Sequence, residues 1–432
     1  MNDVIENTGI KALNQSQLDD ILKLHARFLS GQPGGARASV KDTDLSNLNF
    51  EGADLSQSDF TGCVFRGANL KKVAFTSATL FGCDFSKCNI QHANFSRADL
   101  RGTDIQLSDL TNANFSKADL RTGSSVVKQR RTKDLYGRTG EGRVTFNGSI
   151  MTNANFKGAS ANMADFSDAL LENANFEQAD LRDAILDGAN LSNVEFDGAD
   201  LRSASFNAAN MTGAHMANNE TRGAIFTMAL SDDNPDRENE EFSLTKDELI
   251  LKHQQWVESA GRQGEKMNLS HYDLRKLKNL SDKRLTALVA SHAVFAGLNL
   301  QNLEIQSAQL NCADFRECDL RFADFRGSHM EDAVFVRANM TKVNCGPLVL
   351  KQQDGSIRNI PCCFSNAIMR FADCKEGDFR HADFSSCDLT HAEFDGADLS
   401  YAKFSGANLE AASLKGAKTE GTIFDDDYSI EE

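Results

Sequence analysis

The sequence predicts an all-β solenoid, because a five-residue period runs through most of the chain. From Leu45 to Leu120, every fifth residue is Leu, Phe or Ile, and a small or apolar residue stands two positions before most of them. The same pattern returns over Phe146–Phe226, Phe295–Cys345 and Phe364–Phe424. A period of five fits neither the 3.6-residue period of a helix nor the two-residue period of a strand. It therefore indicates a repeat architecture with its own geometry.

An inward side chain at every fifth residue requires the chain to turn a corner every five residues. Four such steps close a coil of about twenty residues, and the next coil would stack at about 4.8 Å, the spacing of paired strands. In the unit Ala53-Asp54-Leu55, Leu55 would point inward, Ala53 would fill the space beside it and Asp54 would face outward. We expect a solvated outer face, so neighbouring carboxylates there carry no information about catalysis.

Units such as Gly52-Ala53-Asp54-Leu55-Ser56 resemble those of the pentapeptide-repeat family. This resemblance implies a right-handed quadrilateral β-helix. Some members of that family protect DNA gyrase by mimicking DNA, so the resemblance also supplies one candidate function.

The chain reads as two tandem halves, each preceded by a short amphipathic α-helix. The first helix is predicted over Ser16–Ser30, with Ser16 and Asp19 resembling a capping box, and the second begins at Thr245 with Glu248. In order, we expect a flexible N-terminus (1–12), a first helix and solenoid (13–230), an acidic linker (231–242), a second helix and solenoid (243–424) and an acidic tail (425–432).

Both predicted helices place a His on an apolar face, His25 in the first and His253 in the second. The ends of a solenoid expose apolar columns and unpaired backbone, so we expect the helices to act as caps and each His to make a single hydrogen bond there. The second helix is expected to cover the end of the array that stops near Phe226. The apolar residues that would do so are Leu249, Ile250, Trp256 and Val257.

Each half is interrupted by a predicted hairpin insertion, at 121–145 and at 346–361, and the second contains the turn signal Asp354-Gly355. All four Pro lie in interruptions of the repeat, where a residue that cannot donate to a ladder belongs. The segment Asn268–Ser291 keeps the Leu spacing but loses the small residue. It is interpreted either as degenerate coils or as a short helical excursion.

Charge and cysteine usage point to an ordinary intracellular protein. The net charge is −16, but Ser231–Glu241 holds six acids and one Arg, and the tail Asp425–Glu432 holds five more acids. The ten Cys show no C-x-x-C spacing, and several occupy small-residue slots. Cys63 and Cys83 should stack on adjacent coils, yet we expect free thiols and a cytoplasmic location. No segment is apolar enough to span a membrane, and no secretory signal is recognised.

The insertion at 121–145 is the candidate partner-binding loop, because it gathers basic residues around one aromatic in an acidic protein. Such a loop could contact phosphates, membrane lipid or an acidic partner, or it could be a solvated hairpin that tolerates charge. The residues in question are Lys128, Arg130, Arg131, Lys133, Tyr136, Arg138 and Arg143.

No motif in the chain indicates chemistry: H-E-x-x-H, paired-Cys zinc spacing, a P-loop and G-x-S-x-G are all missing from the sequence. We therefore expect no catalytic, cofactor or metal site, no direct binding to nucleic acid, and a scaffold or adaptor that presents its surface to protein partners. The alternatives are a DNA mimic acting on gyrase or another nucleic-acid-binding protein, and an enzyme with its site in the hairpins or in Asn268–Ser291.

Overall fold

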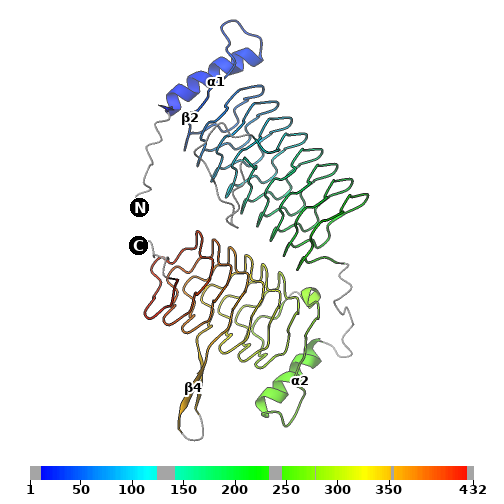
Figure 1. The fold of residues 1–432 in the computed structure, drawn as a ribbon, viewed down its shortest axis with the longest axis vertical. Helices are drawn as coiled ribbons and strands as arrows, with labels where there is room; N and C mark the ends of the chain where they lie inside the picture. The colour runs from blue at the N-terminus through cyan, green and yellow to red at the C-terminus, as the bar shows by residue number, and fades with distance from the viewer. Residues whose placement is uncertain (1–10, 124–141, 233–245, 278, 352–354, 426–432) are drawn as a thin grey trace. The chain divides into compact units, whose positions relative to one another are not determined.

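The computed structural model describes residues 11–123, 142–232, 246–277, 279–351 and 355–425 (Figure 1). The chain divides into two compact units, residues 1–233 and 234–432. Each unit has its own hydrophobic core, which runs from Leu18 to Met211 in the first and from Ile250 to Leu414 in the second. Each unit is therefore described by itself.

Stacked coils of twenty residues build both units, as the five-residue period predicted. Residues twenty apart pair as parallel bridges at every fifth position, for example Asp54 with Ala74. The N–H of Leu55 donates to the carbonyl of Ala74 at 2.7 Å, while the N–H of Ala53 closes a turn on the carbonyl of Phe50 at 2.9 Å. The backbone is thus satisfied between coils and at the corners, as buried peptide groups require.

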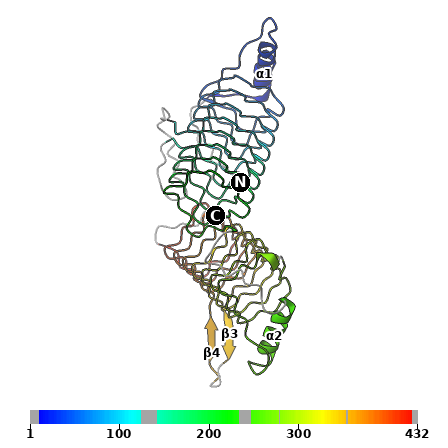
Figure 2. The ribbon, with the colours of Figure 1, turned by 90° about the vertical axis from the view of Figure 1, so that its right-hand side faces the viewer.

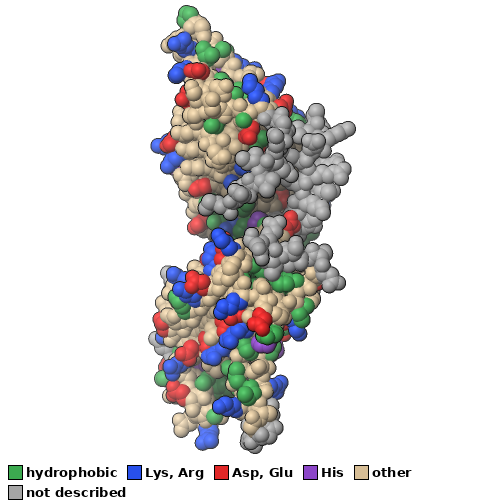
Figure 3. Space-filling model, turned by 90° about the vertical axis from the view of Figure 1, so that its left-hand side faces the viewer, with side chains coloured by type: hydrophobic (Ala, Val, Ile, Leu, Met, Phe, Trp, Pro, Cys, Tyr) green, Lys and Arg blue, Asp and Glu red, His purple; other side chains and the backbone are tan. Residues whose placement is uncertain are grey.

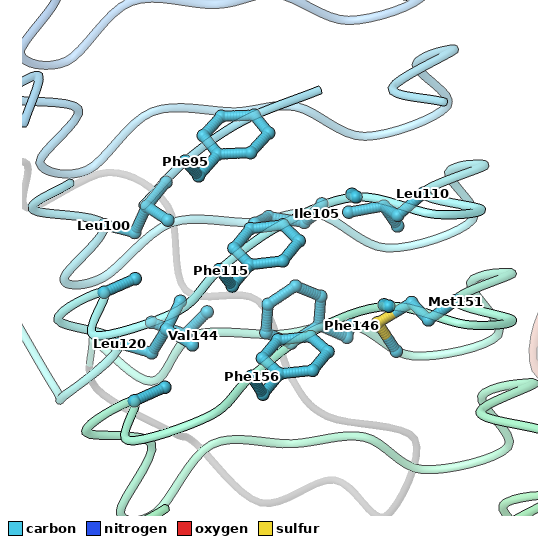
Figure 4. Packing of buried hydrophobic residues seen from close by; sticks show 14 of the residues in the cluster. Phe95, Leu100, Ile105, Leu110, Phe115, Leu120, Val144, Phe146, Met151 and Phe156 are labelled. Atoms are coloured by element: carbon cyan, nitrogen blue, oxygen red, sulfur yellow. The ribbon is translucent and has the colours of Figure 1, made fainter. Parts of the chain in front are cut away.

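Stacked Phe rings lie beside Leu, Ile, Val and Met side chains in the inward columns (Figure 4). Phe95 lies over Phe115 with a centroid distance of 4.9 Å, and Phe115 lies over Phe156 at 4.9 Å. Phe146 meets Phe156 edge-on at 5.8 Å. Offset stacking along a column and edge contacts across it are the preferred aromatic geometries, so the columns contribute beyond their buried area.

Helix α1 (Gln15–Leu29) lies at the start of the first unit, after β1 (Lys11–Ala12). β1 pairs in parallel with β2 (Thr43–Asp44). The prediction that Ser16 and Asp19 form the capping box is wrong. Asn14 caps the helix: its Oδ1 accepts the N–H of Gln17 at 3.0 Å, and its own N–H donates to Oε1 of Gln17 at 3.0 Å. Asn14 and Gln17 have the same three-residue spacing as Ser16 and Asp19, and the helix begins after Asn14.

Helix α2 (Lys246–Glu258) packs on the first coils of its own unit. Ile250 is buried in the second core, and Leu249 packs against that core from the same face. The expectation that this face closes the array ending near Phe226 is wrong. The apolar face of α2 already has a surface in the coils that immediately follow it, which are adjacent in sequence and therefore cost little loop entropy to reach.

The segment Asn268–Ser291 combines the two interpretations left open by its sequence. It forms coils, but Asn268 and Asp273 pair with Val289 and Val294, twenty-one residues on, whereas Asn279 returns to a twenty-residue step. A 3₁₀ turn at Arg275–Leu277 takes up the extra residue. Such short turns are a common way to accommodate an irregular connection.

Coil stacking continues across both insertions. Asp104 pairs with Thr145 across the first insertion, and His329 pairs with Cys363 across the second. In the second unit the insertion forms an antiparallel ribbon of β3 (Leu348–Lys351) and β4 (Ile357–Ile360). The ribbon projects away from the coils of that unit (Figures 1 and 2).

Candidate functional site

The basic insertion predicted as a partner-binding loop is described only at its stem. Lys128, Arg130, Arg131, Lys133, Tyr136 and Arg138 lie outside the described residues. Arg143 is half-buried beside the stem, and its Nη1 atom is buried with no hydrogen-bond partner among the described residues. The stem therefore places one cation of the predicted set against the coils.

Close contact between two glycines sets the position of this stem. The N–H of Gly123 donates to the carbonyl of Gly142 at 2.8 Å. A Cβ added to Gly142 would lie 1.8 Å from the carbonyl oxygen of Gly123, and the φ of Gly142 is +72°. Only glycine combines that approach with that conformation. Sequence reasoning missed this requirement, although Gly142 is visible just before the repeats resume.

His25 and His253 occupy equivalent places under the two helices. Nδ1 of His25 accepts the N–H of Ala38 at 3.0 Å, and Nε2 lies 3.1 Å from the carbonyl of Ser56. His253 makes the same pair of contacts, with the N–H of Met267 at 3.0 Å and the carbonyl of Thr286 at 3.0 Å. A neutral imidazole with its proton on Nε2 satisfies both bonds. Each His thus makes two hydrogen bonds instead of the expected one, and these bonds join its helix to the backbone of the following coils.

Because both imidazoles are buried, burial lowers the pKa of His25 and of His253. The unfolded chain takes up a proton at each position below pH about 6.5, whereas the folded caps resist it. The stabilisation that the two neutral imidazoles provide is therefore fully present above that pH and declines as the pH falls.

We expect the urea midpoint of the second unit to fall between pH 7.5 and pH about 5, above the range in which ordinary carboxylates titrate. In the first unit, the raised pKa of Asp104, about 6, acts in the opposite direction, because the folded state takes up that proton more readily. His253→Gln should flatten the dependence of the second unit. A midpoint of the second unit that stays constant over that range would contradict the assigned role of the imidazole.

Acidic side chains in the outward slots are tied to their own repeat. The Oδ1 atom of an Asp or Asn accepts the N–H two residues on, as Asp54 does from Ser56 at 3.0 Å. Where the sequence of the repeat is Asp-Leu-Arg or Asp-Phe-Arg, the Arg also donates two hydrogen bonds to the carboxylate. Arg182 donates to Asp180 in this way at 2.8 and 2.7 Å. Bidentate pairs of this kind join Asp99–Arg101, Asp119–Arg121, Asp180–Arg182, Asp200–Arg202, Asp273–Arg275, Asp319–Arg321, Asp324–Arg326 and Asp378–Arg380.

These arginines neutralise part of the acidic surface. Hydrogen bonds from Arg182, Arg202 and Arg321 lower the pKa values of Asp180, Asp200 and Asp319 respectively. Exposed pairs of this kind contribute little to stability, because water and salt screen them. Their effect is on the pattern of charge, and acidic and basic side chains intermingle on the face seen in Figure 3. The signal was readable in the sequence as the recurring Asp-x-Arg spacing.

Some outward slots are buried, which corrects the expectation of a uniformly solvated outer face. Asp84 and Asp165 lie on one column of the first unit and are 2% and 0% exposed. Each accepts the N–H and the hydroxyl of the Ser two residues on, Ser86 and Ser167. Asp104 lies between them on the same column, and burial, with a contribution from Asp84, raises its pKa to about 6. Hydrogen bonds to the neighbouring Ser offset part of the cost of burying Asp84 and Asp165.

All ten cysteines are free thiols, and eight of them are buried. The Cys83 thiol donates to the carbonyl of Phe60 at 2.9 Å, and the Cys63 thiol to that of Val40 at 3.3 Å. Burial raises the pKa values of Cys63 and Cys88 to about 12. Thiols held protonated in this way are poor nucleophiles, because the thiolate is the reactive form.

In titration with a thiol reagent, we expect the native chain to react only at half-exposed Cys312 and Cys363. The chain unfolded without reductant should release ten thiols. A shortfall of two after unfolding would instead indicate a disulfide, with stacked Cys63 and Cys83 the first pair to examine.

Within the described part of the chain, no group of three or more His, Cys, Asp or Glu side chains is arranged to hold a metal ion. None of the helices in that part is long and apolar enough to cross a membrane.

Two models of repeat families match the chain over more than half its length. A "Pentapeptide repeat region" matches residues 36–115 and 142–224, and "Pentapeptide repeats" match 313–344 and overlapping segments within 362–425. The chain belongs to the pentapeptide-repeat family. The matches leave out both helices, most of the first insertion and all of the second.

Several solved pentapeptide-repeat proteins are similar to this chain. HetL, involved in heterocyst differentiation regulation in the cyanobacterium Nostoc sp. strain PCC 7120, is 16% identical over 92% of this chain and 97% of its own (TM-score 0.13). QnrB1, a plasmid-mediated fluoroquinolone resistance protein, is 21% identical over 45% and 84% (TM-score 0.19). Rfr23 from the cyanobacterium Cyanothece 51142 is 23% identical over 30% and 89% (TM-score 0.17).

These TM-scores are low, so no structural or functional argument rests on the three proteins. No curated protein sequence matches the chain.

Proposed function

We propose that this pentapeptide-repeat protein is a non-enzymatic scaffold or adaptor that presents repeat surfaces and projecting loops to protein partners. The observation that carries the proposal is that the His, Asp and Cys side chains described above are engaged in stabilising the fold. His25 and His253 hold the caps, the outward carboxylates bind their own backbone and arginines, and most thiols are buried.

The architecture supports the same proposal. Coil-to-coil hydrogen bonds and packed apolar columns hold each unit together, and most outward slots lie outside those columns. Repeat proteins use such extended surfaces for binding. We propose that the coil is right-handed, as the family resemblance implies. We also propose that the amphipathic helices α1 and α2 cap the coils.

The buried free thiols support a reducing compartment, and we propose the cytoplasm. There, oxidation would not compete with their role as small core residues.

A DNA mimic acting on gyrase is the second candidate, and its basis is the acidic repeat surface. The pairs Asp180–Arg182 and Asp200–Arg202 weigh against it, because they put a cation beside each carboxylate where a mimic would need an array of free negative charge. In a gyrase supercoiling assay, we expect no change in activity at equimolar chain. Inhibition or protection from a gyrase inhibitor would favour the mimic instead.

The proposal is tested by affinity capture from the source cell with the full chain immobilised. We expect the same small set of proteins to be enriched over a urea-unfolded sample of the chain, and to bind again when purified. The proposal is lost if no purified candidate binds, or if the chain turns over a substrate instead.

A further inference from the structure

The ribbon of β3 and β4 exposes an unusual amount of apolar surface for its size. Val349 is 54% exposed, Leu350 44% and Ile357 64%, although each strand has only four residues. Only the ends of the ribbon nearest the coils, Leu348 and Ile360, are half-buried. Clustered exposed apolar side chains on a projecting element mark an interaction site more often than scattered single ones do.

Close contact with one coil corner fixes the base of the ribbon. A Cβ added to Gly327 would lie 2.9 Å from Cβ of Leu348 and 3.4 Å from Cγ2 of Ile360. The absence of a side chain at Gly327 therefore lets the ribbon leave the coil at this point. The rest of the ribbon stands clear of the coils (Figure 2).

The sheet of β3 and β4 contains only these two strands among the described residues. The outer edge of each strand is thus available for pairing. A two-stranded ribbon alone is marginally stable in water, and a third strand with an apolar contact is the usual way to stabilise it.

The register of the ribbon defines what a third strand would meet. Lys351 pairs with Ile357, and Leu350 pairs with Arg358. Partners in an antiparallel pair point to the same face, so each face offers an apolar side chain beside a cation. Val349, paired with Asn359, adds a second apolar residue to the face of Ile357. No acidic residue lies on either strand.

We propose that this ribbon binds an extended segment of a protein partner, which adds to it as a third strand and carries alternating apolar and acidic residues. Backbone hydrogen bonds would supply affinity. Apolar residues of the segment would lie on the face of Val349 and Ile357, and its acidic residues on the opposite face, with Arg358. Opposite charges across paired strands stabilise, and like charges destabilise. The inference rests on the proposed function, and it names the kind of partner and the site.

A second copy of this chain is the less suitable occupant. Pairing of two identical ribbons would bring Lys351 and Arg358 of one copy close to the same cations of the other, with no acid on either strand. An acidic segment removes that repulsion, and its alternation places the acids on the face of Arg358.

The probe is a display library of randomised peptides about ten residues long, enough for one strand, selected on the full chain. We expect enrichment of peptides that combine acidic and β-branched or aromatic residues. Val349→Thr with Ile357→Thr should weaken the binding of the enriched peptides about tenfold or more. Thr keeps the β-branched shape that the ribbon needs. The matched control is Ile423→Thr, which alters a side chain of similar exposure (50%) in an outward slot of the same unit.

A charge swap tests the chemistry independently. Lys351→Glu with Arg358→Glu should abolish binding of the acidic peptides, and selection on that variant should enrich basic peptides instead. Circular dichroism of each variant should match the wild type, since the ribbon lies outside the core.

The inference is overturned if no peptide is enriched, if enriched peptides bind the ribbon variants unchanged, or if the charge swap leaves the preference acidic. Self-association of the chain that Ile357→Thr abolishes would make a second copy the occupant and overturn it too. Partners captured from the cell that still bind both ribbon variants would refute this site while leaving the scaffold proposal intact. Failure to capture any partner would count against the scaffold alone.

Discussion

Replacing Phe95 with Asp is expected to unfold the first unit at room temperature. Phe95 is fully buried between Phe75 and Phe115, with ring centroids 5.3 and 4.9 Å away. Loss of a buried Phe costs about 3–5 kcal/mol, and an unpaired buried carboxylate adds several more. Together these reach the about 5–15 kcal/mol that stabilises a typical domain. Circular dichroism should show the transition of the first unit lost and that of the second, with its own core, retained.

Asn94→Asp is the matched control, because it adds the same charge one residue away in an outward slot. Asn94 is half-buried, and its Oδ1 accepts the N–H of Ser96 at 3.0 Å, a bond that Asp would keep. We expect a change of less than about 0.5 kcal/mol for this control. If Phe95→Asp left the melting temperature unchanged, the inward assignment of the five-residue period would be wrong.

Replacing His25 with Ala is expected to destabilise the first unit by about 2–4 kcal/mol. The change leaves the buried N–H of Ala38 and the carbonyl of Ser56 without the imidazole. It also removes the ring that stacks on Phe28 at 5.7 Å. Urea denaturation should measure the loss, and hydrogen exchange should place it in α1 and the first coils.

The duplication provides an internal repeat of this experiment. His253→Ala should weaken the second unit by a similar amount, since His253 makes the same bonds and stacks on Trp256 at 5.9 Å. His215→Ala, at an exposed His in the first unit, is the control and should have little effect. Equal, small effects at His25 and His215 would show that the imidazole does not hold the cap.

The fold could be read from the sequence because each five-residue unit encodes its own geometry. The inward Leu or Phe, the small residue and the Asp or Asn that bonds its own backbone all lie within one unit, as in Ala53-Asp54-Leu55. Repetition then fixes the stacking, because every coil must bury the same column. The candidate basic loop was also identified from sequence, through composition alone, and its role stays a prediction.

Contacts between residues far apart in the chain needed the tertiary structure. The docking of α2 on its own unit, the approach of Gly142 to Gly123 and the seating of the ribbon at Gly327 depend on which surfaces meet in space. Burial of outward slots such as Asp165 is of the same kind. The sequence by itself thus determined the period, the inward columns and the places where the coil is interrupted. Only the tertiary structure decided how the interruptions and caps attach, because close packing depends on neighbours that a local repeat does not specify.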